Sequence, residues 1–318
     1  MNHDPHDDAP AQTPDQPAAR HGRCGVVALV GAPNAGKSTL MNRMVGAKLS
    51  IVTHKVQTTR TRVRGVAIEG DSQVVFVDTP GVFSSPKRRL ERAMVASAWQ
   101  GADDADVVVL LYDVSRKQVD EDTLKMVRRL NDLSTPLVLA LNKIDRIKRE
   151  KLLEIAARFD QEGQFERIFM ISAETGDGID DLRGYLSTRI PEGPWLFPED
   201  QLSDLPMRLI AAEVTREKLF LRLHEELPYA LTVETEDWQQ FDDGSVRIEQ
   251  AIYVEREAQK KIALGRQGST IRKVREAAQA DLEEQLGCPI HLFLFVKVRE
   301  GWTDDPERYA PWGLDFNA

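Results

Sequence analysis

The sequence has little cysteine and no long apolar run, and both shortages exclude classes of protein. Among 318 residues the only cysteines are Cys24 and Cys288. They are far apart and have no second Cys or His at metal-binding spacing, which argues against a disulfide framework and a cysteine zinc site. We interpret them as buried or incidental thiols. No stretch approaches the roughly 18 apolar residues of a membrane span, so we expect any membrane contact to be peripheral.

The first residues also lack the apolar segment of a secretory leader. Its absence predicts a cytoplasmic protein. Residues 1–24 are rich in Pro, Asp and Ala, a composition that predicts a disordered N-terminal extension. His3 and His6 lie in this acidic stretch, and we interpret them as solvated side chains rather than metal ligands. The chain as a whole carries a formal net charge of -9, which makes any concentration of basic residues informative.

Short apolar runs organise the first half of the chain. With 42% hydrophobic residues over this length, the chain can bury the cores of two domains. Amphipathic stretches separate the runs, a pattern typical of strands buried on both faces of a mainly parallel sheet. The runs are residues 25–30, 74–77, 107–112, 137–141 and 168–172. Residues 61–69 alternate and predict an edge strand, so residues 25–190 are predicted to form one doubly wound α/β domain.

The second half has a different order of elements. Three prolines within residues 191–200 predict a linker over 191–204. A helical pattern follows, then two alternating strands, two helices flanking a glycine pair, and an apolar strand at 289–298. This order, α-β-β-α-α-β, predicts a separate α+β domain over 205–300 and a C-terminal tail over 301–318. The halves show no internal repeat.

A phosphate-binding motif follows the first apolar run. Residues 31–38 read GAPNAGKS and match G-x-x-x-x-G-K-[ST] between a predicted strand and a predicted helix. The glycines let backbone N–H groups point at phosphate oxygens, and the helix N-terminus adds positive potential. Lys37 is expected to reach the β- and γ-phosphates and Ser38 to bind Mg²⁺. The predicted phosphate-binding residues are Gly31, Ala32, Pro33, Asn34, Ala35, Gly36, Lys37, Ser38 and Thr39.

A carboxylate ends the second buried run. Residues 74–81 read VVFVDTPG, which places Asp78 at a strand end opposite the phosphate loop. This position suits the Mg²⁺ shell, through a bridging water. The nucleotide-binding residues predicted here are Asp78, Thr79, Pro80, Gly81 and Val82.

The sequence LNKID at 141–145 identifies the base. Guanine presents an N1–H and a 2-amino group, both of which the Asp145 carboxylate can accept, whereas adenine offers an acceptor there. A lost charge-assisted pairing costs about 2 kcal/mol or more, which predicts GTP rather than ATP. Asn142 is expected to meet the other purine edge, Lys143 to pack along the ring and support the phosphate loop, and the Ala173 N–H to bind the guanine carbonyl. The predicted base-binding residues are Asn142, Lys143, Ile144, Asp145, Ser172, Ala173 and Glu174.

These motifs occur in the order typical of one lineage. The chain resembles the translation-factor-related GTPases in its sequence of GAPNAGKS, QTTR, DTPG, NKID and SAE. QTTR at 57–60 is similar to the switch sequence of the Era family. The resemblance implies that a switch threonine closes on Mg²⁺ and the γ-phosphate, and Thr59 is a better match than Thr58. The implied magnesium ligands are Ser38, Thr59 and Asp78.

Val82 occupies the position after DTPG where Ras-type GTPases carry a catalytic glutamine. Valine forms no side-chain hydrogen bond and cannot orient the attacking water. Hydrolysis is therefore expected to depend on Lys37, Mg²⁺, the Gly81 N–H and the closed Thr59 loop. We expect slow intrinsic turnover that a partner accelerates. The resemblance also implies that Asn34 recruits K⁺ beside the phosphates; a loop hydrogen bond is the alternative. The predicted catalytic residues are therefore Lys37, Thr59, Gly81 and Asn34.

A second glycine turn lies in the most basic part of the chain. Residues 265–268 read GRQG, and 256–275 hold seven Lys or Arg and one Glu. An isolated G-x-x-G pair is more often a helix cap, but the α-β-β-α-α-β order favours a type II KH domain, whose turn approaches the backbone of unpaired RNA. The predicted RNA-binding residues are Lys260, Lys261, Ile262, Gly265, Arg266, Gln267, Gly268, Ile271, Arg272 and Lys273.

Residues 208–234, 254–274 and 291–302 are also similar to the Era family, so the resemblance covers nearly everything after residue 24. It implies binding to the 3′ end of 16S rRNA in 30S subunit assembly, a monomer, and peripheral contact with the inner membrane. The chain departs from the family in its N-terminal extension and in Ala35, where valine is common. The alternative is a signalling GTPase whose second domain binds protein. A lineage member that modifies tRNA or assists metallocentre assembly would carry another partner domain and cysteine chemistry that this chain lacks.

Overall fold

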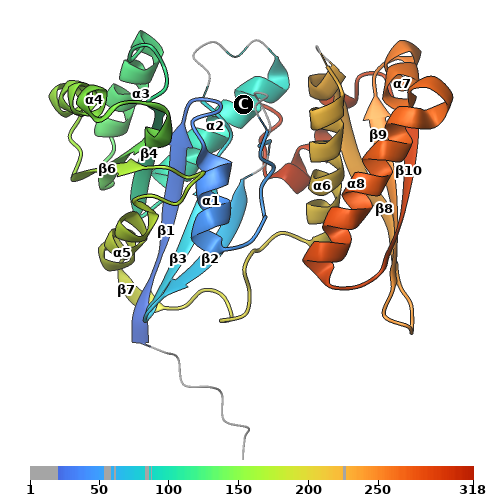
Figure 1. The fold of residues 1–318 in the computed structure, drawn as a ribbon, viewed down its shortest axis with the longest axis horizontal. Coiled ribbons are helices and arrows are strands. Elements are labelled where there is room, and N and C mark those ends of the chain that lie inside the picture. The colour runs from blue at the N-terminus through green and yellow to red at the C-terminus, as the bar shows by residue number, and fades with distance from the viewer. Residues whose placement is uncertain (1–20, 54–58, 61, 83–85, 87, 225–226) are drawn as a thin grey trace, which may run out of the picture.

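The computed structural model describes residues 21–53, 59–60, 62–82, 86, 88–224 and 227–318. Two domains lie side by side in the structure (Figure 1). Residues 1–20 of the predicted N-terminal extension and Thr58 lie outside the described residues. Residues 21–24, predicted to be disordered, instead begin the first strand. No helix in the described ranges combines the length and the apolar character needed to cross a bilayer.

The first domain is built on a mainly parallel sheet, as predicted. Its strand order is β2-β3-β1-β4-β5-β6, with β2 antiparallel to β3 at the edge. The apolar runs form central strands because both faces of the sheet are covered, and every residue of β3, β4 and β5 is buried. The strands are β1 (His21–Gly31), β2 (Val63–Glu69), β3 (Ser72–Asp78), β4 (Val107–Asp113), β5 (Leu137–Asn142) and β6 (Arg167–Ile171).

Helices cover both faces of this sheet. On one face α1 (Lys37–Val45) and α5 (Ile179–Arg189) pack against the odd residues of β1, such as Val27 and Leu29. On the other, Trp99, Met126 and Phe159 pack against the even ones; they come from α2 (Arg89–Asp103), α3 (Glu121–Asn131) and α4 (Arg149–Glu162). Because the parallel strands end at one edge, the loops that follow β1, β3, β4 and β5 meet there.

The predicted linker is attached to the first domain along much of its length. Within it, β7 (Glu192–Pro194) pairs antiparallel with β1. The buried Gln73 side chain then accepts hydrogen bonds from the backbone N–H groups of Leu196 and Phe197 at 2.9 and 3.0 Å. The prolines break the helical period as expected, but the segment forms an additional edge of the sheet.

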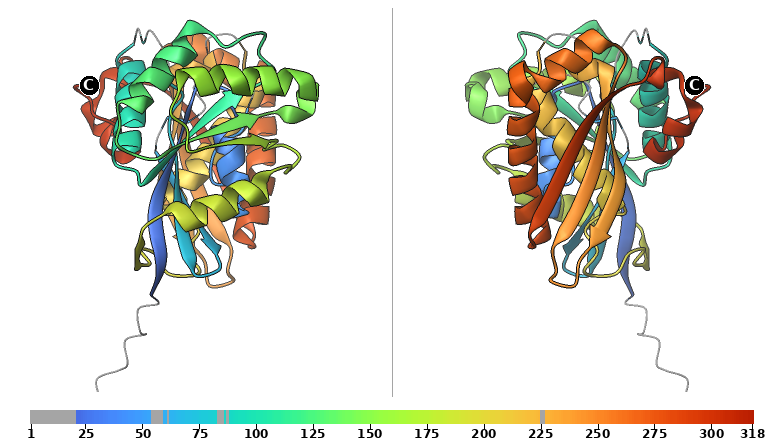
Figure 2. Two further views of the ribbon diagram at one scale, coloured as in Figure 1. Left: turned by 90° about the vertical axis from the view of Figure 1, so that its left-hand side faces the viewer. Right: turned by 90° about the vertical axis from the view of Figure 1, so that its right-hand side faces the viewer.

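The second domain has the predicted α-β-β-α-α-β order. It contains α6 (Met207–Arg222), β8 (Leu231–Gln240), β9 (Val246–Val254), α7 (Glu257–Leu264), α8 (Ser269–Leu286) and β10 (Ile290–Val298). The sheet order is β10-β9-β8, with β10 parallel and β8 antiparallel to β9. The sheet lies on the side away from the first domain, which leaves α6 and α8 facing it (Figures 1 and 2).

The last segment, expected only as a tail, returns to the first domain. Trp302 and Tyr309 are each 1% exposed, and with Trp312 and Leu314 they pack against Met94 of α2. The C-terminus accordingly lies beside α2 in Figure 1. Buried aromatic side chains contribute large apolar areas, so this segment joins the two domains.

Candidate nucleotide and RNA sites

The phosphate loop has the backbone geometry that its glycines predict. Gly36 has a φ of +100°, and a Cβ there would lie 2.2 Å from Asn142 Nδ2, so only glycine fits. The Lys37 Nζ donates to the carbonyl oxygens of Gly31 and Ala32 at 3.0 and 3.1 Å. Burial lowers the pKa of Lys37 to about 8 from 10.5. This lysine therefore lies inside the loop, over the carbonyl groups beside the expected phosphates.

The predicted magnesium ligands converge below this loop. Ser38 Oγ lies 2.7 Å from Asp78 Oδ2 and 2.9 Å from Thr59 Oγ1, and the Thr59 hydroxyl lies 3.2 Å from the same carboxylate oxygen. Asp78 is fully buried, and burial raises the pKa of its carboxyl. Two hydroxyls and a buried carboxylate form the oxygen ligand set that Mg²⁺ prefers. The described residues contain no cluster of three or more His, Cys, Asp or Glu side chains arranged for a metal.

Lys143 supports the phosphate loop, as predicted. Its Nζ donates to the Asn34 carbonyl at 2.8 Å and to Asp113 Oδ2 at 2.6 Å. Asn34 has a φ of +63°, so this contact holds an unusual backbone conformation in place. Asp113, the last residue of β4, is not among the residues predicted from the motifs. A carboxylate at the end of a buried strand, beside the site, was the signal available for it.

Asn142 makes two internal hydrogen bonds that its motif did not predict. Its side chain is buried, donates to the Ala35 carbonyl at 2.7 Å and accepts from the Ala173 N–H at 2.9 Å. The Ala173 N–H, predicted to bind the guanine carbonyl, thus has an internal partner, because the buried Asn142 oxygen requires a donor. Asn142 joins the phosphate loop to the loop after β6, and its contact with the purine stays a prediction.

The base-recognition loops are held by side chains on either side. Asp145 Oδ1 accepts a 2.6 Å hydrogen bond from the Ser172 hydroxyl, which orients the carboxylate. Arg43 on α1 donates to the carbonyl groups of Ala173 and Glu174 at 2.7 and 2.5 Å. Arg43 is not among the predicted site residues, since nothing in its spacing distinguishes it from a solvated helix residue.

The turn after β3 contributes mainly backbone. The Thr79 side chain is buried and donates to the Leu29 carbonyl at 2.7 Å, so it supports the turn from behind. The Val82 N–H donates to the Gly31 carbonyl at 3.2 Å. A Cβ on Gly81 would lie 2.9 Å from Pro33, so this turn packs directly against the phosphate loop. The catalytic role of the Gly81 N–H stays a prediction.

A cavity of about 610 Å³ lies over the phosphate loop and reaches Lys143 and Glu174 of the two base-recognition loops, whereas Asp145 is not among its lining residues. Its walls include Lys37, Thr59 and Lys143, and also Leu221 from α6 of the second domain. The structure thus brings the phosphate, metal and base loops to one opening, and it adds a wall that the motifs did not predict. Ala35 and Thr79 lie behind this surface rather than on it.

The G-x-x-G turn has the geometry expected of a backbone-binding site. Gly265 has a φ of +73°, and a Cβ there would lie 2.2 Å from Thr270 Oγ1. Gly268, with a φ of +75°, has its nearest such contact at 4.0 Å and therefore opens to solvent. Gly265 packs tightly against Thr270 inside the turn, whereas Gly268 is open to close approach by a ligand.

Positive charge surrounds this turn. Five cations have no ion-pair partner among the described residues: Lys260, Lys261, Arg266, Arg272 and Lys273. Ile262 is 58% exposed, which suits contact with a base, whereas Ile271 packs against the domain core. Uncompensated charge beside an exposed apolar side chain is the arrangement that binds a polyanion with unstacked bases.

Known proteins resemble both domains. A family model described as a 50S ribosome-binding GTPase matches residues 26–143, and a KH domain model matches residues 226–303. GTPase Era of Sinorhizobium medicae is 60% identical over 294 residues, covering 92% of this chain and 94% of that protein. GTPase Era of Mesorhizobium japonicum is 57% identical over 305 residues, covering 96% and 97%.

Solved structures give the same result. A variant of Aquifex aeolicus Era bound to GDP.AlF4- is 35% identical, with a TM-score of 0.86, and covers 92% of this chain and 99% of that one. Era in complex with MgGDPNP and nucleotides 1506–1542 of 16S ribosomal RNA is 36% identical, with the same TM-score and coverage.

Proposed function

The chain belongs to the Era family of GTPases, and from this premise we propose that it binds the 3′ end of 16S rRNA through its KH domain in assembly of the small ribosomal subunit. GTP and GDP are its nucleotides. A solved Era structure contains MgGDPNP and nucleotides 1506–1542 of that RNA. Since 16S rRNA belongs to the small subunit, we assign the chain to the 30S precursor despite the broader family's 50S description.

One observation carries the proposal: a GTPase phosphate site and a G-x-x-G turn occur in one chain, and the cations around the turn have no ion-pair partner within the described ranges. The order of motifs alone is shared with signalling GTPases. The Gly268 backbone is open: a Cβ added there would lie 4.0 Å from its nearest neighbour, the Ile271 side chain. A domain that bound protein would gain nothing from this opening. Close approach to a phosphate backbone uses this opening directly, which favours RNA over a protein partner.

Hydrolysis in this site depends on positioning and charge. Ser38, Thr59 and Asp78 are the residues that would hold Mg²⁺, which neutralises phosphate charge when bound. Lys37 supplies a further positive charge, and the Gly81 N–H is our proposed hydrogen-bond donor to the reacting phosphate. Val82 supplies no hydrogen bond to a water molecule, so we expect slow intrinsic turnover.

Crosslinking tests the RNA partner. The full-length protein, loaded with GTP, mixed with total cellular RNA and crosslinked, should recover RNA enriched at the 3′ end of 16S rRNA. Recovery of tRNA would contradict the ribosomal assignment, and recovery of no RNA would favour a protein-binding second domain. Magnesium-dependent GTP binding by the purified protein tests the nucleotide site separately.

We also propose that K⁺ assists hydrolysis beside Asn34. The Asn34 backbone conformation, with a φ of +63°, is held by the Lys143 contact, which fixes the loop where the cation would bind. GTPase rates in potassium and sodium buffers of matched ionic strength should differ, and equal rates would contradict this part of the proposal. We further propose that the protein is a cytoplasmic monomer that makes peripheral contact with the inner membrane.

A further inference from the structure

A second cluster of positive charge lies on the first domain, far in sequence from the G-x-x-G turn. Residues 146–151 read RIKREK, with four basic residues and one acidic residue, in a chain whose formal net charge is -9. Three of these cations, Lys148, Arg149 and Lys151, are exposed at the start of α4, and we call them the α4 patch. Arg146, two residues before the patch, lines the nucleotide cavity. The patch therefore begins next to the nucleotide site.

The cations of the α4 patch are not compensated by neighbouring carboxylates. None of the three has an ion-pair partner in the part of the chain that the structure describes. Other exposed cations of α3 and α4 do have partners there. Lys125 pairs with Asp122 at 3.8 Å, and Arg128 and Arg158 pair with Glu162 at 3.6 and 2.9 Å. The patch thus differs from the charged surface around it.

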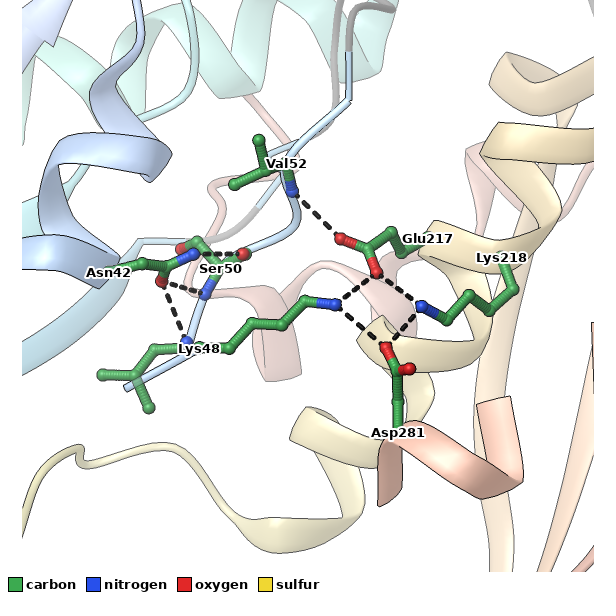
Figure 3. Close-up of polar contacts among 8 residues, drawn as sticks. Asn42, Lys48, Ser50, Val52, Glu217, Lys218 and Asp281 are labelled. Carbon is green, nitrogen blue, oxygen red and sulfur yellow. Dashed lines mark hydrogen bonds and ion pairs between the residues drawn. The ribbon is translucent and has the colours of Figure 1, made fainter. Parts of the chain in front are cut away.

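The contact between the two domains shows cations that have a structural role. Lys48 and Lys218 both pair with Glu217 and Asp281 (Figure 3). Two carboxylates match two ammonium groups, and their attraction offsets the cost of removing the charges from water. The α4 patch has no such match, so its positive field is directed at the solvent and at charged ligands.

The position of the patch is also unfavourable for the helix. Lys148 is the N-cap residue and makes no side-chain capping hydrogen bond, and Arg149 and Lys151 lie in the first turn. The N-terminus of a helix carries positive potential, so cations there destabilise it. The described contacts therefore give these three cations no stabilising role, and their charge is better explained by a ligand.

A phosphate backbone is the ligand that fits the patch best. Phosphate groups of a nucleic acid are bound by Lys and Arg side chains, one or a few at a time. An anionic membrane is a wider surface and would also meet the exposed carboxylates of α4, which are Glu150, Glu154 and Asp160. These carboxylates would repel an anionic surface along the helix, whereas an RNA strand can contact the first turn alone. The charge pattern favours RNA.

The α4 patch and the KH turn lie at the same end of the molecule. Helix α7 leads into the G-x-x-G turn, and both α7 and α4 lie at the top in Figures 1 and 2. We propose that the α4 patch is a second RNA-binding surface, which contacts the phosphate backbone of small-subunit rRNA outside the 3′ end that the KH domain binds. This inference rests on the proposed function, and it places an RNA contact on the GTPase domain itself.

The salt dependence of binding tests the proposal with the full-length protein loaded with GDPNP. The probes are purified 30S subunits and an RNA of nucleotides 1506–1542 of 16S rRNA. The patch variant combines Lys148→Gln, Arg149→Gln and Lys151→Gln. Each lost phosphate contact lowers the slope of log K against log salt by roughly 0.7–0.9, so the slope for 30S subunits should fall by about 2 to 3. Wild type should then lose roughly 20- to 40-fold more affinity than the variant between 50 and 200 mM salt.

Two controls separate a local contact from a general effect of charge. The short RNA should bind the patch variant within about twofold of wild type, because the distant KH domain is not altered. The control variant combines Lys125→Gln, Arg128→Gln and Arg158→Gln, which removes three cations that have carboxylate partners, and it should keep the wild-type slope. None of the three patch residues is among those that line the nucleotide cavity, so an unchanged GDPNP affinity checks the fold of the patch variant.

The outcomes distinguish this inference from the proposed function. Wild-type protein that binds neither probe overturns the proposed function and the inference with it. Wild-type protein that binds both, with an unchanged 30S slope in the patch variant, overturns the inference alone. Equal losses for the two probes, or loss of binding only to phosphatidylglycerol vesicles, would also overturn it. A reduced slope that is limited to 30S subunits, and absent from the control variant, supports it.

Discussion

Replacing Asn142 by alanine is expected to weaken both the fold and the nucleotide site. Its amide satisfies the Ala35 carbonyl at 2.7 Å and the Ala173 N–H at 2.9 Å, and the three residues are 1 to 2% exposed. An unsatisfied buried polar group costs about 1–3 kcal/mol, so two of them lower the free energy of unfolding by about 2–6 kcal/mol. That is a large share of the roughly 5–15 kcal/mol of a typical protein.

Asn131 provides a matched control for this prediction. Its amide also donates to a carbonyl, of Glu162 at 3.2 Å, and accepts from an N–H, of Gln164 at 3.0 Å. Asn131 is only partly buried, so water can replace its amide in the alanine variant, and the expected cost is under about 1 kcal/mol. Each variant removes one hydrogen bond donated to a backbone carbonyl and one accepted from a backbone N–H, and the two sites differ chiefly in burial.

Urea unfolding of the nucleotide-free protein measures both costs, and fluorescence titration with a labelled GTP analogue measures the nucleotide site. Asn142→Ala should lose much more stability than Asn131→Ala and should bind nucleotide more weakly, since Asn142 fixes the phosphate loop relative to the loop after β6. Equal losses in the two variants would refute the reasoning from burial. Undiminished nucleotide affinity in Asn142→Ala would refute its bracing role.

Three further predictions address the base, the RNA and the pH. Asp145→Asn should shift preference from guanine to xanthine, and competition binding with unchanged preference would mean that the base pocket is misplaced. Gly268→Asp should bind RNA about tenfold more weakly than Gly268→Asn in anisotropy titrations, since both tolerate the left-handed φ but only Asp adds a charge; equal affinities would contradict an RNA contact there. The pKa of Lys37 is about 8 in the folded protein, against an ordinary value of 10.5. GTP affinity should therefore fall as the pH rises above about 8, because Lys37 loses its positive charge. The nucleotide-free protein should become more stable as the pH rises from about 8 to 10.5, because there the unfolded chain binds this proton and the folded protein does not. Calorimetry in two buffers should show proton uptake on binding at pH 8.5, and a pH-independent affinity would exclude this titration.

The strands and the phosphate motifs could be predicted because their signals are local. Each buried strand is a continuous apolar run, since a parallel sheet covered on both faces accepts no polar alternation. The phosphate loop needs a tight turn and a lysine within a few residues, so GAPNAGKS contains its own geometry. The RNA turn is similar: Gly265 and Gly268 supply the left-handed conformations that its backbone requires.

The bracing residues could not be predicted, because their partners are distant in the chain. Arg43 contacts Ala173 across 130 positions, and Arg60 contacts Leu231 across 171. In the sequence each is one more basic residue among 42 Lys and Arg. The linker and the C-terminal segment are similar cases, since their apolar and backbone groups find partners only once the first domain is folded.

The two domains, the guanine nucleotide and the basic glycine turn can be predicted from contiguous residues, because periodicity and backbone freedom fix local structure. Three further features depend on the folded arrangement: Asn142 braces two loops, Leu221 lines the nucleotide cavity, and Glu217 and Arg60 form hydrogen bonds between the two domains. Burial and long-range hydrogen bonding give these side chains their roles, and both depend on neighbours that chain order does not specify.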